Sequence, residues 1–159
     1  FTVGVYQRLF GDLENFAVMA DYSYTAWSCF ENLDIYQGSS LISHTAENWK
    51  DTSRVSVGLH YYPEEIEDLT LRFGVCYDES PVKGAQYRTV RIPCSDRIWF
   101  STGFGYDLAE NIKLDMAYVY IMTIGNSEIA PSQYGGSAGD SAHYYGHIHV
   151  ISAQLSFLF

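Results

Sequence analysis

Charged side chains stand at alternate positions of several segments in which the intervening residues are mostly apolar. Because successive side chains of a strand leave opposite faces, charges spaced in this way share one face. A guanidinium pairs well with a carboxylate, so this face has the chemistry to bind an acidic head group. The same charges can instead pair with each other across neighbouring strands, which we consider the commoner arrangement. The residues concerned are Arg54, Arg72, Arg97, Asp21, Asp78 and Asp115.

The last stretch of the chain shows most clearly the alternation that would position such residues. From Ile151 to Phe159 the odd positions are apolar, whereas Ser152, Gln154 and Ser156 are polar. A period of two is the signature of a strand, and six earlier segments repeat it. We therefore expect an all-β protein with about seven antiparallel strands. The expected strands cover residues 1–9, 15–30, 51–62, 68–78, 97–107, 112–124 and 144–159, with 33–37 extending the second.

The connections between these segments alternate between short and long. Outer-membrane barrels have short periplasmic turns and long extracellular loops, and counting back from the last strand places Phe159 on the periplasmic side. In each strand the apolar face is the more uniform one, which predicts lipid outside and a polar lumen inside. A soluble up-and-down barrel would invert this arrangement, and alternation alone does not separate the two. Strands longer than about 10 residues and a terminal aromatic residue favour the membrane.

Composition narrows the class of protein further. The 159 residues suit one domain, and aromatic residues make up 16% of them, with 14 Tyr and 9 Phe. This enrichment is typical of strands and of membrane-interface belts. A net charge of -10 argues against nucleic acid, whose binding needs a basic surface. No apolar run approaches the roughly 20 residues of a spanning helix, but a barrel hides its apolar residues in alternation.

Four motifs carry a family resemblance. WKDTSRVSVGLHYY resembles a W-K-D-x-x-R-x-x-x-G-x-x-Y pattern, LRFGVCYDESPV an R-x-G-x-x-x-D-x-S-P-V segment, and IPCSDRIWFSTGFGY an I-P-D-x-D-R-x-W-x-S-x-G-x-x-Y segment. YTAWSCFENL is similar to the Y-T-x-W-S-x-F stretch just upstream. Together, in order and with short gaps, they resemble the C-terminal half of the FadL/TodX family, outer-membrane transporters of long-chain fatty acids and other hydrophobic compounds. Cys94 stands where the motif usually has Asp.

The resemblance implies an antiparallel transmembrane β-barrel segment, half of a 14-stranded FadL-like barrel. Residues 1–159 would be its C-terminal part, with the N-terminal hatch and the first strands absent. It implies a place in the Gram-negative outer membrane and passive uptake of a long-chain fatty acid or similar compound, with release through a lateral opening in the wall. Expected partners are membrane lipid, lipopolysaccharide and, through the closing strand, the outer-membrane assembly machinery. No cofactor is expected.

Substrate-binding candidates follow from this interpretation. Aromatic residues near the extracellular ends would receive an apolar ligand leaving water, and basic residues would meet its head group. In the connection before Trp49, members of the family that the motifs resemble can carry a lysine near the fatty-acid head group, but this chain offers only His44 there. The candidates are Trp27, Phe30, His44, Trp49, Arg54, Arg72 and Arg97.

Alternatives of other classes remain open. A porin or a structural or adhesive barrel would share the same strand pattern, but a porin would conduct ions. A hydrolase would need His60 or His149 beside Ser56 or Ser152, and no G-x-S-x-G motif supports it. We therefore expect no enzyme.

Histidines and cysteines allow two further hypotheses. His147 and His149 are two apart, a spacing that can hold a metal ion, with His143 in the preceding loop as the nearest third ligand. We interpret these histidines as polar side chains above the bilayer. Three cysteines, at positions 29, 76 and 94, match no C-x-x-C spacing, and a bridge between Cys76 and Cys94 is left open.

Overall fold

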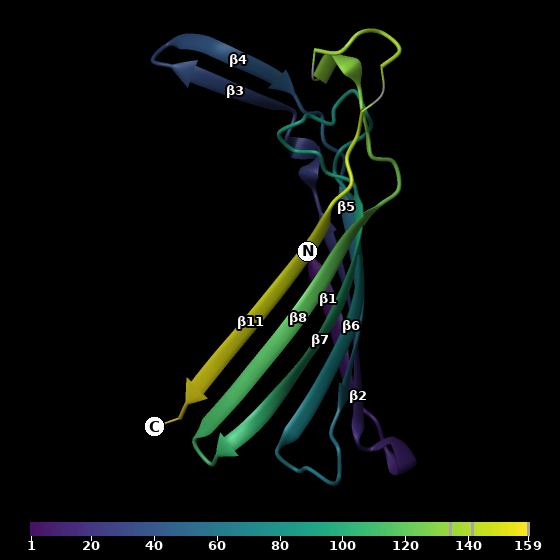
Figure 1. Cartoon of the computed structure of the whole chain (residues 1–159), viewed down its shortest axis with the longest axis vertical. Helices are drawn as coiled ribbons and strands as arrows, with labels where there is room; N and C mark the ends of the chain where they lie inside the picture. Colours follow the sequence, from purple (N-terminus) through teal and green to yellow (C-terminus); the bar gives the residue numbers. More distant parts are fainter. Residues whose placement is uncertain (134, 141, 159) are drawn as a thin grey trace.

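Most strands of the protein form one antiparallel sheet. The computed structural model describes residues 1–133, 135–140 and 142–158. The sheet has seven strands in the order β1-β2-β5-β6-β7-β8-β11, so its neighbours follow one another along the chain (Figure 1). Their bounds are β1 Thr2–Arg8, β2 Phe16–Thr25, β5 Thr52–Tyr61, β6 Leu69–Asp78, β7 Asp96–Ala109, β8 Ile112–Ile124 and β11 His147–Phe157.

The expected all-β antiparallel fold is confirmed, and most strand boundaries agree with the alternation to within a few residues. The second strand is the main exception. It ends at Thr25, and a 3-10 turn, η2 (Trp27–Cys29), follows it. Segment 33–37 does not extend that strand, because it belongs to a separate hairpin of β3 (Asn32–Gln37) and β4 (Ser40–Ala46). The periplasmic position expected for Phe159 concerns a residue outside the described ranges.

The two ends of the sheet differ. At one end the connections are short, and the β1–β2 connection contains only η1 (Gly11–Leu13) as an element. At the other end lie the β3–β4 hairpin, which projects sideways from the sheet, and a group of long loops (Figure 1). These loops carry the short pieces β9 (Glu128–Ile129), η3 (Pro131–Gln133) and β10 (Ala142–His143). The described residues form no apolar helix of membrane-spanning length.

Register puts two kinds of side chain on the two faces of the sheet. One face carries exposed apolar residues, including Val57, Val75 and Ile151, of which Ile151 is 76% exposed. Charged residues lie on the other face, where Arg54 stands opposite Asp78 and Asp78 stands opposite Arg97. Few apolar residues are buried anywhere in the described chain, so the apolar face is left to the surroundings rather than to a core. This is the arrangement of a membrane wall.

A buried arginine joins two of the long loops. Arg88, only 4% exposed, lies in the β6–β7 connection, and its Nε donates to the carbonyl of Cys94 at 2.9 Å. Its Nη1 donates to the carbonyl of Glu128 in the β8–β11 connection. Ser95, also buried, donates from Oγ to the carbonyl of Asn126 at 3.0 Å. Burial lowers the pKa of Arg88, and these carbonyl acceptors compensate for the lost hydration.

Candidate ligand-binding surface

Contacts that skip a strand identify which face of the sheet is concave. Arg72 on β6 reaches Asp115 on β8, with Nη1 and Oδ1 2.6 Å apart, although β7 lies between them. Arg54 on β5 lies over the ring of Trp99 on β7, 5.0 Å from its centroid. Both contacts lie on the charged face, so side chains converge there. We call it the inner face, and we call the apolar face the outer face.

Glycine lets the backbone approach closely beneath these contacts. A Cβ added to Gly105 would lie 2.7 Å from Asp115 Oδ1 and 2.8 Å from Arg72 Nη2. A Cβ on Gly103 would lie 2.6 Å from the Met116 carbonyl oxygen. Gly58 and Gly74 stand directly opposite each other on β5 and β6. The inner face therefore lacks side chains at these positions of β5, β6 and β7, and the space that they would fill forms a hollow.

The lower hollow has a volume of about 450 Å³ and lies over three of these glycines. Gly58, Gly74 and Gly103 contribute to its floor, and Met19 and Val119 to its apolar lining. Arg54 lies on its lining as well, and so does Arg72. An apolar floor beside a guanidinium suits an amphiphile, because the acyl chain is removed from water while the head group meets the cation.

The upper hollow, of about 460 Å³, lies at the loop end of the same face. Trp27, Trp49, Arg54 and Arg97 line it, so the structure brings four of the predicted site residues together. Since Arg54 also lines the lower hollow, the two hollows meet at this residue.

An aromatic cluster forms one wall of the upper hollow. Trp27 and Trp49 pack edge to face with centroids 5.2 Å apart, and Phe30 packs on Trp49 at 4.7 Å. The Trp49 indole donates to Glu47 Oε2 at 3.0 Å. Asn48 adopts a left-handed φ of 44°, which asparagine tolerates better than most residues, and so allows the chain to turn just before Trp49.

Asp51 fixes the turn that carries Trp27. Its Oδ2 accepts a hydrogen bond from the Tyr24 hydroxyl at 2.5 Å, and its Oδ1 accepts one from the Ser28 backbone N–H at 2.8 Å. The hydrogen bond from Tyr24 and those from Ser28 lower the pKa of Asp51 below its usual 3.8. The carboxylate is therefore the form that holds the turn in place.

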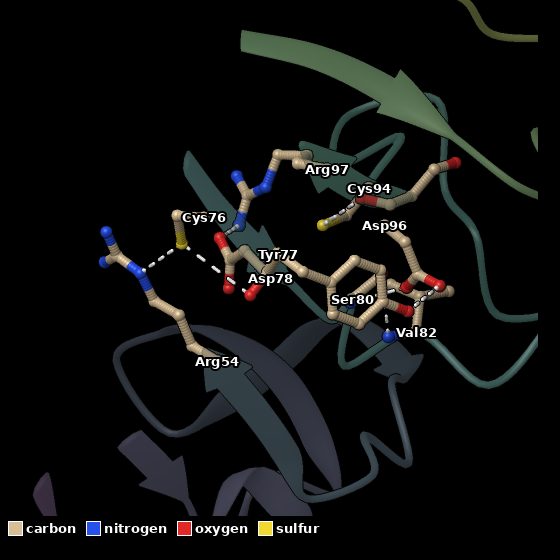
Figure 2. A network of polar contacts seen from close by, with 10 residues as sticks. Arg54, Cys76, Tyr77, Asp78, Ser80, Val82, Cys94, Asp96 and Arg97 are labelled. Carbon is tan, nitrogen blue, oxygen red and sulfur yellow. Dashed lines mark hydrogen bonds and ion pairs between the residues drawn. The ribbon is translucent and has the colours of Figure 1, made fainter. Parts of the chain in front are cut away.

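Among Arg54, Arg72 and Arg97, it is Arg54 that forms no ion pair with a carboxylate of the described residues. Its Nε donates to Cys76 Sγ at 3.0 Å (Figure 2). Its guanidinium lies over the ring of Trp99. Arg97 also lies near Trp99, at 5.9 Å, but its Nη2 pairs with Asp78 Oδ2 at 2.8 Å. Arg54 thus keeps a charge available, whereas Arg72 and Arg97 are neutralised by their aspartates.

The entry to the β6–β7 connection is held by another aspartate. Asp96 Oδ1 accepts from the Ser80 backbone N–H at 2.8 Å, and its Oδ2 accepts from the Tyr77 hydroxyl at 3.0 Å (Figure 2). The hydroxyl of Ser80 accepts in turn from the Val82 backbone N–H at 3.2 Å. This network gives the D-x-S-P-V segment a structural role, as its turn-forming residues indicate.

His44 lies apart from the hollows, whereas Ser56, His60 and Cys76 line the lower hollow and Cys94 lines the upper one. His44 is on the β3–β4 hairpin, where its Nδ1 lies 2.6 Å from Asp34 Oδ1. Ser56 donates to Asp21, and His60 pairs with the Tyr62 hydroxyl at 3.3 Å. Cys29, Cys76 and Cys94 are all free thiols, so the bridge left open between Cys76 and Cys94 is not formed. The described residues contain no group of three metal-ligating side chains.

Several residues that line the hollows were not candidates in the sequence analysis, and Trp99, Cys76 and Gly74 matter most among them. Trp99 and Cys76 are the partners of Arg54, and Gly74 belongs to the floor of the lower hollow. Their parity along the strands was available, because Trp99 follows Arg97 by two and Cys76 precedes Asp78 by two. What was missing was the register that places the three strands side by side.

A wall with an apolar outer face, a charged inner face and long loops at one end defines a class of protein, the outer-membrane β-barrel. The model of the outer membrane protein transport family (OMPP1/FadL/TodX) matches residues 1–159. The chain therefore belongs to this family, and its place is the outer membrane of the Gram-negative envelope. The family named from the motifs is confirmed.

Relatives and a solved structure agree with this assignment. The chain is 36% identical over 110 residues to the 47 kDa outer membrane protein of Pasteurella multocida, covering 68% of this chain and 24% of that protein. It is 33% identical over 106 residues to the long-chain fatty acid transport protein of Escherichia coli K12, covering 66% and 23%. The crystal structure of a Pseudomonas aeruginosa FadL homologue superposes with a TM-score of 0.67 at 24% identity, covering 92% of this chain and 32% of that one. The chain thus spans about a quarter to a third of these proteins' length.

Proposed function

We propose that this chain forms part of the wall of an uptake path for a long-chain fatty acid or a similar hydrophobic carboxylate. The observation that carries the proposal is Arg54, a guanidinium without a carboxylate partner among the described residues, at the junction of the two hollows. A ligand carboxylate is the partner that such a group lacks. The aromatic cluster above it and the glycine floor below it offer apolar surface to the acyl chain.

Uptake on this proposal is passive. The acyl chain leaves water for the surface around Trp27 and Trp49, and the hydrophobic effect supplies the driving force. The head group then meets Arg54, whose guanidinium Trp99 holds in orientation. The acyl chain can next lie along the lower hollow toward the periplasmic end. No covalent step is part of this path.

A matched pair of ligands and a matched pair of variants test the proposal. We expect Arg54→Gln in the intact protein to weaken oleate binding about tenfold or more, the loss of a charge-assisted hydrogen bond. Binding of oleyl alcohol, which has no charge, should change little. Arg72→Gln is the control, since Arg72 is already paired with Asp115.

Titration calorimetry in neutral detergent and uptake by cells expressing each variant provide the two readouts. Equal losses of affinity for oleate and for oleyl alcohol would show that Arg54 supports the structure of the wall and does not bind the carboxylate. High ion conductance in planar bilayers without fatty-acid binding would favour the porin alternative.

We also propose that residues 1–159 are the C-terminal part of a barrel that is completed by a hatch and further strands. The long loops would then meet lipopolysaccharide, and the closing strand would be read by the assembly machinery. The coverage of 23% to 32% of the compared proteins supports a partial wall.

A further inference from the structure

Four rings form a continuous stack on the outer face of β8 and β11, near the loop end of the sheet. Tyr120 and His147 are stacked with centroids 5.8 Å apart and planes 7° apart. Tyr120 also lies 5.1 Å from His149, which stacks on Tyr118 at 6.0 Å. We call these four residues the ring stack. None of them lines either hollow of the inner face.

Each histidine of the ring stack is fixed by a tyrosine hydroxyl. Tyr118 Oη lies 2.7 Å from His149 Nδ1, and Tyr120 Oη lies 2.7 Å from His147 Nδ1. Both imidazoles are exposed. When the hydroxyl donates to Nδ1, the ring carries its proton on Nε2, so each histidine presents an N–H donor on a fixed ring. An anion nearby selects this tautomer.

The height of the ring stack can be estimated from the strand. His149 is eight residues from Phe157 at the short-turn end of β11, about 26 Å along a strand. With a tilt of about 35–45°, this is roughly 20 Å across the membrane, and His147 lies roughly 5 Å higher. The apolar band of such barrels is about 25 Å tall. The two histidines therefore lie at its upper edge, where lipid head groups begin.

We propose that the ring stack binds the phosphate group of an outer-leaflet lipid. Two N–H donors on fixed rings at head-group height match a phosphate, and the tyrosine rings offer a flat surface to the adjoining acyl or sugar carbons. His44 is paired with a carboxylate, whereas His147 and His149 are paired with hydroxyls and have no negatively charged neighbour in the stack. A metal is the poorer ligand, because the described residues supply no third ligand.

Lipid retention in native mass spectrometry tests this site. The intact protein in neutral detergent is mixed with dioleoyl phosphatidic acid or with dioleoylglycerol, which has the same tails and no phosphate. We expect the protein to retain phosphatidic acid preferentially. In the double variant His147→Gln and His149→Gln this retention should fall about tenfold, the loss of a hydrogen bond to a charged group. His44→Gln is the matched control and should retain the lipid as the unmodified protein does.

A second variant covers the case in which the histidine changes prevent folding. Tyr118→Phe with Tyr120→Phe keeps both imidazoles and removes the hydroxyls that fix them, so a smaller fall in retention is expected. Equal retention of the two lipids would overturn the proposal, as would binding of nickel or zinc by the unmodified protein without any preference for phosphatidic acid. Unchanged retention in both double variants would overturn it too.

Discussion

The upper and lower hollows adjoin at Arg54 but are built in different ways. Side chains and loops shape the upper hollow: Trp27 stands on a turn that Asp51 holds, and Trp49 follows a left-handed Asn48. Backbone register shapes the lower hollow, since Gly58, Gly74 and Gly103 leave space only while three strands stay aligned. A change in the glycine floor of the lower hollow should therefore affect stability first, whereas a change in the side chains around either hollow should affect binding first.

The largest effect is expected at Gly103. In Gly103→Ala the new Cβ would lie 2.6 Å from the Met116 carbonyl oxygen, and that oxygen belongs to the neighbouring strand. We expect the free energy of unfolding to fall by about 1–3 kcal/mol, measured by urea unfolding in lipid vesicles. Gly84→Ala is the control, because no atom lies within 4 Å of a Cβ there. Equal stability of the two variants would contradict a floor set by the backbone.

Asp115→Asn should give the lower hollow an arginine without a carboxylate partner, as Arg54 is at the junction with the upper hollow. The change leaves Arg72 without its carboxylate, so we expect carboxylate binding to strengthen severalfold while binding of the matching alcohol stays constant. The stability cost should be about 1 kcal/mol or less, since both side chains are partly exposed. Asp107→Asn, which removes the partner of Lys113 by the same chemical change, is the control. Oleate titrations of both variants decide the outcome.

Trp99→Leu tests the support of Arg54. The guanidinium loses the ring on which it lies, a contribution of about 0.5–1 kcal/mol at a partly exposed site, so oleate binding should weaken a few fold. Trp99→Phe keeps an aromatic face and should restore most of the affinity. If the leucine and phenylalanine variants bind oleate equally, the ring does not orient Arg54.

The smallest effect concerns Asp51 and pH. Because its pKa is lowered in the folded protein, the hold of its carboxylate on the Trp27 turn is complete above the usual value of 3.8 and is lost as the pH falls below it. Acrylamide quenching of tryptophan fluorescence should then rise at acidic pH. Asp51→Asn should show the higher quenching already at neutral pH, with no further rise at acidic pH. Trp27→Phe should lose the acid-induced rise in quenching. A transition of the same size in Asp51→Asn would point to another group.

The strands and their two faces could be predicted from the sequence alone. The alternation around Arg54, Arg72 and Arg97 placed all three on the charged face, and the short and long connections gave the two ends of the sheet. These are local properties, because the period of two follows from the geometry of a single strand. The motifs likewise identified the family, which the match over residues 1–159 confirms.

The partner of each of these residues, in contrast, depends on the tertiary structure. The register of the strands pairs Arg72 with Asp115 and Arg97 with Asp78. It places Arg54 in contact with Cys76 and Trp99 instead. Trp27 and Phe30, which were expected in a strand, lie in a turn and directly after it, and His44 lies on a separate hairpin. Pairings between strands depend on how distant segments align, and no pattern within one segment carries that information.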